Sequence, residues 1–497
     1  MKKKPIKLCF KGGKGDFRSS IESLMSSAAA EGFTVGDLKT NKAGTKGTVR
    51  IDAGFLELVL AVNVDKDGDA GRVRTIRILE NGEETLRIKR VTQPYDAITK
   101  MLDRIEAVVE RKGSAAFTDV AAIIYRTFGK RGFEIDGSAA DDFAEVLPGG
   151  SFSGGPGNDT AIVTPESGGF PYGGRESFPD VIDGGPGDRD FVSFERAERG
   201  KKSRGVDVKL AKDKAVIDGE KIGIKKFEGV GGTTGEDKLT GDGADNSFFG
   251  LDGADRISGL GGDDGIFSGN GDDRNNGNAG DDLIDSGAGK DVNRGGAGDD
   301  VINSGGGADQ NFGGSGADEI NSGAGADTNR GDGGDDVIRS GDGNDFNIGG
   351  SGDDLIEAGG GGDILRGFGG SDTLRGELGD DLLQGGLGDD VLLGGGGSDT
   401  LDGGPGLNTV TGDGPGQAPS ADLFVLTGDM GEVVEGYDVI TDFDSTMDTF
   451  SLTGDLAYED LTIAQDNADV SISNGEDLLA RVQNDTVTAI DNQDLFA

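Results

Sequence analysis

The stretch Gly295-Gly-Ala-Gly-Asp-Asp-Val-Ile-Asn303 is one copy of a nine-residue pattern. A second copy, Gly385-Gly-Leu-Gly-Asp-Asp-Val-Leu-Leu393, has the same form, Gly-Gly-x-Gly-x-Asp-x-U-x, in which U is apolar. From Gly232 to Thr411 the chain divides without a gap into 20 such units, 180 residues in all. A flexible linker does not hold one register over that length, so the pattern predicts a repeat architecture in which neighbouring units stack.

The residue types within a unit predict a tight turn followed by a short strand. Glycine reaches positive φ, so the Gly-rich half of each unit can turn sharply and expose its carbonyl groups. Carbonyl oxygens together with a carboxylate are hard ligands of the kind that Ca²⁺ prefers. The three residues after the Asp form a strand that points U inward. Two units then make one coil of a parallel solenoid, so residues 18 apart stack on one another.

Splitting the array at this spacing separates two faces, each with a column of candidate calcium ligands at position six. The first-face column is Asp237, Asp255, Asp273, Asp291, Asp309, Asp327, Asp345, Asp363, Asp381 and Asp399. The second-face column is Asp264, Asp282, Asp300, Asp318, Asp336, Asp354, Asp372 and Asp390, with Asn246 and Asn408 at its two ends. One ion between each pair of neighbouring Asp residues gives nine sites on the first face and seven on the second. We therefore predict about 16 Ca²⁺, whose charge nearly balances the net −28 of residues 232–411.

The inward U positions differ between the faces. The second face is apolar throughout, whereas the first carries five asparagines in successive coils, Asn275, Asn293, Asn311, Asn329 and Asn347. Stacked amides can bond to one another, each NH₂ group donating to the next carbonyl, so we expect a structural ladder. The alternative is an outward stripe of asparagines that binds a ligand.

Composition excludes several classes of protein. The 497 residues contain no His, so a His-ligated zinc site, a Ser-His-Asp triad and a His general base are excluded. The single cysteine, Cys9, cannot close an intrachain disulfide. The net charge of −44 argues against binding to nucleic acid or to an anionic membrane, and in favour of bound cations. No long apolar segment is present, so we expect no membrane insertion and no signal peptide.

The chain divides into four predicted segments: an α+β domain over 1–147, an irregular β-rich linker over 148–231, the repeat array over 232–411 and a β-rich cap over 412–497. In the first segment we expect a core strand at 55–64, a hairpin around Asn81-Gly82, and amphipathic helices at 95–112 and 117–128. A plain turn is favoured over a calcium loop at 65–69, and a solvated loop over an anionic-glycan site at the basic cluster 196–204.

Two weaker copies of the pattern lie in the linker. The first, Gly154-Gly-Pro-Gly-Asn-Asp159, adds Asp159 to the predicted calcium ligands. In the second, which begins at Gly184, Arg189 takes position six and Asp190 follows it, so we predict no site there.

The nonapeptides resemble those of the RTX (repeats-in-toxin) family, the haemolysin-type calcium-binding proteins of bacteria. The resemblance implies a parallel β-roll in which the position-six Asp and the glycine-loop carbonyls hold Ca²⁺. It also implies export by the type I secretion machinery through an uncleaved C-terminal signal, for which the last residues, 494–497, are a candidate. Calcium outside the cell would then trigger folding.

These observations predict a secreted, mainly β, calcium-binding protein that is not an enzyme. We expect an element of the cell surface or extracellular matrix, or an adhesin, with a surface glycan or matrix component as a partner. The alternative is a secreted enzyme that acts on polysaccharide through a carboxylate pair. RTX proteases and lipases both need a catalytic His, which this chain lacks, and a pore-forming toxin would need long apolar helices. Without Ca²⁺ we expect the array to be disordered, because its carboxylates repel one another.

Overall fold

The computed structural model describes strands over 34–40, 46–52, 56–63, 72–80, 83–89, 134–137 and 143–146. It then describes residues 151–163, 181–195 except 188, 197, 205–427 except 218, 436–483 except 455 and 476, 490, and 495–496. The structure does not describe the helices expected at 95–112 and 117–128 or the turn expected at 65–69. The Arg and Lys residues of the basic cluster at 196–204 also lie outside the described residues. The chain forms two compact units, Met1–Thr240 and Gly241–Ala497.

The first unit begins with an antiparallel meander. Its strands are β1 (Thr34–Thr40), β2 (Lys46–Asp52), β3 (Leu56–Asn63), β4 (Arg72–Glu80) and β5 (Glu83–Lys89), each paired with the next along the chain. Glu80 of β4 lies opposite Glu83 of β5, which confirms the hairpin predicted around Asn81-Gly82. Strand β3 coincides with the strand predicted at 55–64.

Parallel pairing starts within the first unit, before the repeat array. One sheet contains β6 (Glu134–Gly137), β8 (Ser151–Ser153), β10 (Val181–Asp183) and β14 (Glu220–Lys225). The other contains β7 (Phe143–Val146), β9 (Thr160–Val163), β11 (Phe191–Ser193) and β15 (Gly229–Gly231). Strand β12 (Val206–Lys209), the 3₁₀ turn η2 (Leu210–Lys212), β13 (Lys214–Ile217) and β16 (Lys238–Thr240) complete the unit. The two-sheet arrangement therefore extends across the predicted boundaries at 147 and 231.

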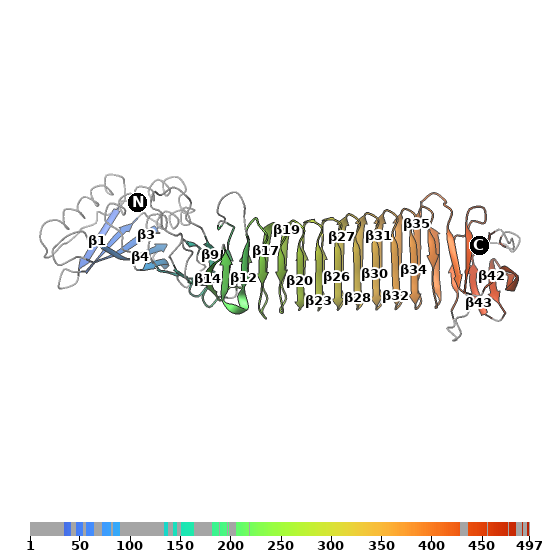
Figure 1. The fold of residues 1–497 in the computed structure, drawn as a ribbon, viewed down its shortest axis with the longest axis horizontal. Coiled ribbons are helices and arrows are strands. Elements are labelled where there is room, and N and C mark those ends of the chain that lie inside the picture. The colour runs from blue at the N-terminus through green and yellow to red at the C-terminus, as the bar shows by residue number, and fades with distance from the viewer. Residues whose placement is uncertain are drawn as a thin grey trace, which may run out of the picture. The chain divides into compact units, whose positions relative to one another are not determined.

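The second unit is a parallel β-roll, whose strands stack side by side in Figure 1. Its first-face sheet contains β18 (Arg256–Ser258), β20 (Arg274–Ala279), β23 (Val292–Ala297), β26 (Gln310–Ser315), β28 (Thr328–Gly333), β30 (Phe346–Ser351), β32 (Ile364–Gly369), β34 (Leu382–Leu387) and β36 (Thr400–Asp402). Its second-face sheet contains β17 (Ser247–Asp252), β19 (Gly265–Asn270), β21 (Leu283–Asp285), β22 (Ala288–Gly289), β24 (Val301–Asn303), β25 (Gly306–Gly307), β27 (Glu319–Ala324), β29 (Val337–Asp342), β31 (Leu355–Gly360), β33 (Thr373–Leu378), β35 (Val391–Gly396) and β37 (Asn408–Asp413).

The register confirms the predicted coil. Arg256 pairs with Arg274 in the first-face sheet, and Val391 pairs with Thr409 in the second, both 18 residues apart. Strands pair with the next coil rather than with a sequence neighbour because two Gly-rich turns reverse the chain within each period. Residues at the same position of every second unit therefore lie in line along the roll.

The core of the roll is the stack of inward U side chains. On the second face these are the apolar residues Phe248, Ile266, Ile284, Ile302, Ile320, Ile338, Ile356, Leu374, Leu392 and Val410, all at most 2% exposed. On the first face Ile257, Leu365, Leu383 and Leu401 are equally buried and flank the five asparagines. The roll therefore has a narrow core with about one side chain per nonapeptide.

The roll continues beyond Thr411 into the predicted cap. Strands β38 (Leu423–Thr427) and β40 (Thr449–Thr453) extend the first-face sheet, and β39 (Asp438–Ile440) and β43 (Asp477–Val482) extend the second. The 3₁₀ turn η3 (Tyr458–Asp460) precedes β41 (Leu461–Asp466), which pairs antiparallel with β42 (Asp469–Asn474). Phe450 stacks between Phe443 and Phe496, with ring centroids 4.5 Å and 5.1 Å apart, and Phe424 packs against Phe443 with its ring tilted by 52°. The β-rich character predicted for this segment is confirmed.

Candidate metal centre

The predicted position-six aspartates are buried in both units. All 19, Asp159 and the 18 of the array, have an exposed fraction of at most 3%. Each array Asp ends a glycine turn and directly precedes a strand, so its side chain is held beneath the turn instead of extending into water. Carboxylates are rarely this buried without a partner, so these columns need a source of compensating charge or hydrogen bonds.

One oxygen of each carboxylate is used in a hydrogen bond between coils. The backbone N–H of Asp300 donates to Oδ1 of Asp318 at 2.8 Å, and that of Asp336 donates to Oδ1 of Asp354 at the same distance. The same bond recurs along both columns from Asp255 to Asp399, and each one joins residues 18 apart, which is the length of one coil. Oδ1 therefore fixes the orientation of each carboxylate.

The other oxygen has no hydrogen-bond partner. Oδ2 is buried and unpaired in every predicted Asp from Asp264 to Asp399. Burial is the main cause that raises the pKa of Asp300 and Asp336 to about 7, and repulsion from neighbouring aspartates raises it further. In Asp399 the same causes raise the pKa to about 8. A cation beside Oδ2 would remove both penalties at once.

In most units position one is glycine, which leaves space beside Oδ2; six first-face units carry Ser or Ala there instead. A Cβ on Gly295 would lie within 3.0 Å of Oδ2 of Asp300, and a Cβ on Gly394 would meet both Oδ2 of Asp399 and the carbonyl oxygen of Gly412 in the next coil. A carboxylate oxygen and a carbonyl oxygen thus converge over the glycine. Gly298 has φ of +130°, a left-handed conformation that favours glycine.

These observations test whether Ca²⁺ fits the array. The donors are oxygens, and one is an unpaired buried carboxylate oxygen. In the units whose position one is glycine, the space in front of that oxygen is one that any side chain would fill. No group of three or more His, Cys, Asp or Glu side chains suited to a metal occurs among the described residues. The carboxylates instead stand singly along each column with carbonyls beside them, a donor set that matches Ca²⁺. When bound, the ion would supply positive charge that bridges successive coils.

Asn408 ends the second-face column in a different way. Its Oδ1 accepts the N–H of Asp390 at 3.0 Å, as an aspartate would. Its Nδ2, in the place of the unpaired oxygen, donates to the carbonyl of Gly404 at 2.9 Å and to Oδ1 of Asp438 at 2.8 Å. The amide therefore satisfies this position by hydrogen bonds alone.

At the other end, Asn246 resembles its aspartate neighbours more closely. Its N–H donates to Oδ1 of Asp264 at 2.7 Å, and its own Oδ1 accepts the N–H of Asp242 at 3.0 Å. A Cβ on Gly241 would meet that Oδ1, so an oxygen still lies at the glycine turn.

The structure places Asp190 where sequence counting placed Arg189. Oδ1 of Asp190 accepts the N–H of Asp159 at 2.7 Å, its Oδ2 is buried and unpaired, and its side chain is fully buried. A Cβ on Gly184 would meet that Oδ2, as in the array. The second weak copy thus contains one extra residue, which the fixed spacing of the pattern conceals.

The asparagines form the predicted ladder and face inward. Nδ2 of Asn293 donates to Oδ1 of Asn311 at 2.9 Å, and Nδ2 of Asn311 donates to Oδ1 of Asn329 at 2.8 Å. The same link joins Asn275 to Asn293 and Asn329 to Asn347, and all five are at most 1% exposed. The outward ligand stripe considered as the alternative is therefore wrong.

Serines that the nonapeptide pattern does not predict complete this ladder. Ser304 Oγ donates to Oδ1 of Asn311 at 2.7 Å, and Nδ2 of Asn293 donates to Ser286 Oγ at 2.9 Å. Each serine replaces the position-one glycine of an Asn-bearing unit. The coincidence of Ser at position one with Asn at position eight was the signal available in the sequence.

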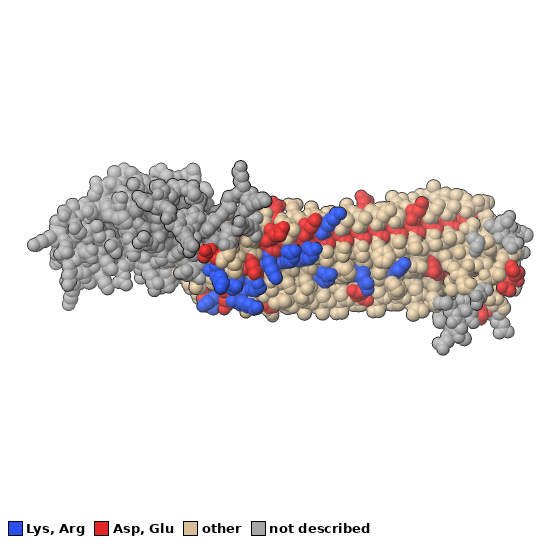
Figure 2. All heavy atoms as spheres, in the orientation of Figure 1, with Lys and Arg blue, Asp and Glu red and all other residues tan. Residues whose placement is uncertain are grey.

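The outer surface of the roll carries charge in rows. Figure 2 shows a line of acidic side chains along one face of the array. Exposed position-five aspartates form one such row, and Asp263 and Asp281 each accept an N–H from the next coil at 2.9 Å. This second acidic row adds negative charge next to the buried columns.

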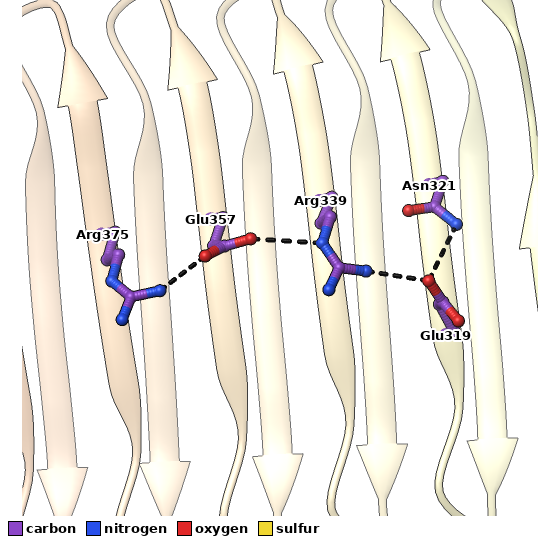
Figure 3. Close-up of polar contacts among 5 residues, drawn as sticks. All are labelled: Glu319, Asn321, Arg339, Glu357 and Arg375. Atoms are coloured by element: carbon purple, nitrogen blue, oxygen red, sulfur yellow. Dashed lines mark hydrogen bonds and ion pairs between the residues drawn. The ribbon is translucent and has the colours of Figure 1, made fainter.

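A row of alternating charges lies on the second-face sheet, drawn in Figure 3. Arg339 bridges Glu319 at 2.8 Å and Glu357 at 3.2 Å, and Glu357 also contacts Arg375 at 2.5 Å. These side chains are 27–47% exposed, so each pair contributes on the order of 0–1 kcal/mol. They reduce repulsion on the outer surface and do not belong to the metal centre.

Taken together, the fold and the buried carboxylate columns define a calcium-binding parallel β-roll. Eight segments between residues 231 and 410 match the family model of the RTX calcium-binding nonapeptide repeat. The array thus consists of RTX repeats, which bind calcium, and in this region the protein is structural.

Two further comparisons add little. Among solved structures, the crystal structure of the extracellular lipase LipA from Serratia marcescens matches with 11% identity, over 96% of this chain and 87% of that one, with a TM-score of 0.16. A likeness at that TM-score supports no argument. Comparison with curated proteins gives no match.

Among the described residues, no helix has both the length and the apolarity to cross a membrane.

Proposed function

We propose that the protein is a secreted calcium-binding element of the bacterial cell surface or matrix, which folds when it meets Ca²⁺ outside the cell. The observation that carries the proposal is the unpaired, buried Oδ2 that recurs along both columns. A protein that folds without metal has no physical reason to bury a row of unpaired carboxylates.

The ligands we propose are the position-six aspartates already named, together with glycine-turn carbonyls. Oδ2 of each Asp contributes charge, and the carbonyl of the next coil contributes a second oxygen, as around Gly394. About 16 ions on the two faces of the array, by one ion per Asp pair, would offset most of its net charge. Asp190 joins the set on the same geometry.

The link to secretion rests on the family. RTX repeat proteins are typically secreted, and an acidic repeat that stays unfolded at low calcium suits passage through the type I secretion machinery as an extended chain. At higher Ca²⁺ outside the cell, binding would supply the folding free energy. We propose residues 412–497 as the segment that both caps the roll and carries the export signal.

A role at the surface is favoured over a catalytic one. The repeat region is structural, and its outward side chains form charged rows along the roll. Such rows suit multivalent contact with a surface glycan or matrix component. No observation favours the polysaccharide-acting enzyme considered as the alternative.

Release from cells tests this function. Intact producing cells are washed with buffer containing either Ca²⁺ or a chelator, and the chain is then measured in the wash and on the cells. We expect it on the cell surface in Ca²⁺ and in the wash after chelation. A chain that stays inside the cells in both conditions would contradict the proposal.

A further inference from the structure

The first-face column does not stop at the last nonapeptide. The N–H of Asp399 donates to Oδ1 of Asp422 at 2.9 Å, the same bond that Asp381 makes to Asp399. Leu423 in turn donates its N–H to the carbonyl of Asp399 at 2.8 Å. Asp422 thus occupies the next place in the column, although it lies outside the residues that match the repeat family.

Five extra residues explain why the pattern misses it. Thr400 pairs with Leu423, an offset of 23 in place of 18. The extra residues form an exposed loop that Asp413 closes, because its Oδ1 accepts both the N–H of Ser420 at 3.1 Å and its hydroxyl at 2.5 Å. With the loop set aside, Gly412 stands at position one, Asp422 at position six and Phe424 at the inward position, where it is 1% exposed.

The surroundings of Asp422 reproduce those of a repeat aspartate. Its side chain is 2% exposed, and Oδ2 is buried without a hydrogen-bond partner. A Cβ on Gly412 would lie within 3.0 Å of that Oδ2, as a Cβ on Gly295 would lie within 3.0 Å of Oδ2 of Asp300. The buried, unpaired carboxylate oxygen and the space above the glycine are therefore both present, as in the array.

The next residue in the first-face column, Asp448, differs from Asp422 in having hydrogen-bond partners for both carboxylate oxygens. Asp448 accepts the N–H of Asp422 through Oδ1 at 2.9 Å and the N–H of Asp444 through Oδ2 at 2.7 Å. Both of its oxygens have partners, so it leaves no oxygen that needs a cation. Asp422 is thus the last unpaired carboxylate of the first-face column among the described residues.

From these contacts we infer that Asp422 and Gly412 form a calcium site outside the nonapeptide array, which fastens the C-terminal cap to the last coil. The inference rests on the proposed calcium function and extends it to residues that the repeat pattern does not include. One bound ion here would join β36 to β38 across the five-residue insertion.

Counting bound ions tests this site. Native mass spectrometry of the full chain in Ca²⁺ would compare wild type with Asp422→Asn and with Asp477→Asn, which makes the same change at an exposed position. We expect one ion fewer in Asp422→Asn and no change in Asp477→Asn. An unchanged ion count in Asp422→Asn would overturn the site, whereas a wild type that binds no calcium would overturn the proposed function.

Should Asp422→Asn fail to fold, crystals of the wild-type chain grown in Ca²⁺ decide the matter. An anomalous peak at about 2.3–2.6 Å from Oδ2 of Asp422 is expected. Peaks along the array with none at Asp422 would contradict the inference.

Discussion

At position six, Asp399 and Asn408 occupy equivalent places on the two faces, yet their second branch atoms meet different surroundings. Oδ2 of Asp399 is buried without a partner, whereas Nδ2 of Asn408 donates to Gly404 and Asp438. The amide carries donors where the carboxylate needs a cation. The atom at this branch of the position-six side chain therefore decides the difference. An oxygen (Oδ2) leaves a buried charge that needs a cation, whereas a nitrogen (Nδ2) is satisfied by hydrogen bonds.

Replacing Asn408 by aspartate should therefore create a calcium site. The new carboxylate oxygen would face the Gly404 carbonyl and Oδ1 of Asp438, three oxygens that repel one another unless a cation lies between them. We expect Asn408→Asp to bind one more Ca²⁺ than wild type by native mass spectrometry. Asn344→Asp, at an exposed position five, is the matched control and should leave the count unchanged.

At the same scale, spacing alone predicts every array aspartate but misses Asp190 and Asp422. One extra residue precedes Asp190 and five precede Asp422, so neither falls at position six when the chain is counted in fixed units of nine. A loop can leave the stack and return without disturbing it, because stacking depends on backbone pairing rather than on chain length. Only the paired register reveals which residue occupies the place.

At the scale of the strand, the Asn ladder replaces apolar packing in five coils of the first face. Periodicity predicts the ladder, since equal residues 18 apart must stack. Periodicity does not predict the role of the serines. A Ser at position one is only a departure from the Gly pattern in the sequence, and its hydrogen bond to the Asn becomes apparent only in the structure. In the structure Ser304 and its equivalents occupy the hydrogen-bonding capacity that the amides leave open.

Removing one amide side chain from the middle of the Asn ladder should destabilise the roll. Asn311→Ala leaves Nδ2 of Asn293 and Oδ1 of Asn329 without their amide partners in a buried column. We expect the free energy of unfolding in saturating Ca²⁺ to fall by about 1–3 kcal/mol, measured by urea denaturation. Asn321→Ala, on the outward side of a neighbouring strand, should change it by less than about 0.5 kcal/mol. Equal losses in the two variants would contradict a structural role for the ladder.

At the scale of the whole molecule, the fold and the charge oppose each other until a cation is present. Residues 232–411 carry a net charge of −28, and their narrow core buries less than one apolar side chain per unit. Composition and period were sufficient to predict this balance. The structure adds that each carboxylate keeps one oxygen unpaired.

Acid should weaken calcium-dependent folding. In the metal-free fold, burial raises the pKa of Asp300 and Asp354 from 3.8 to about 7, so their contribution to stability is present below pH 3.8 and is lost as pH rises through about 7. Calcium binding must displace the protons that these groups retain. We expect the Ca²⁺ midpoint of folding to rise between pH 8 and pH 6, by up to about tenfold per pH unit for each proton released. A midpoint independent of pH would contradict the buried position of these carboxylates.

Far-ultraviolet circular dichroism of the full chain, recorded in excess chelator and then through a Ca²⁺ titration, addresses the central claim most directly. Metal that bridges successive coils should convert a largely unordered spectrum into a strand-rich one, in a steep transition that chelator reverses. A strand signal of full size in chelator, unchanged by Ca²⁺, would show that the roll stands without metal and would contradict the account.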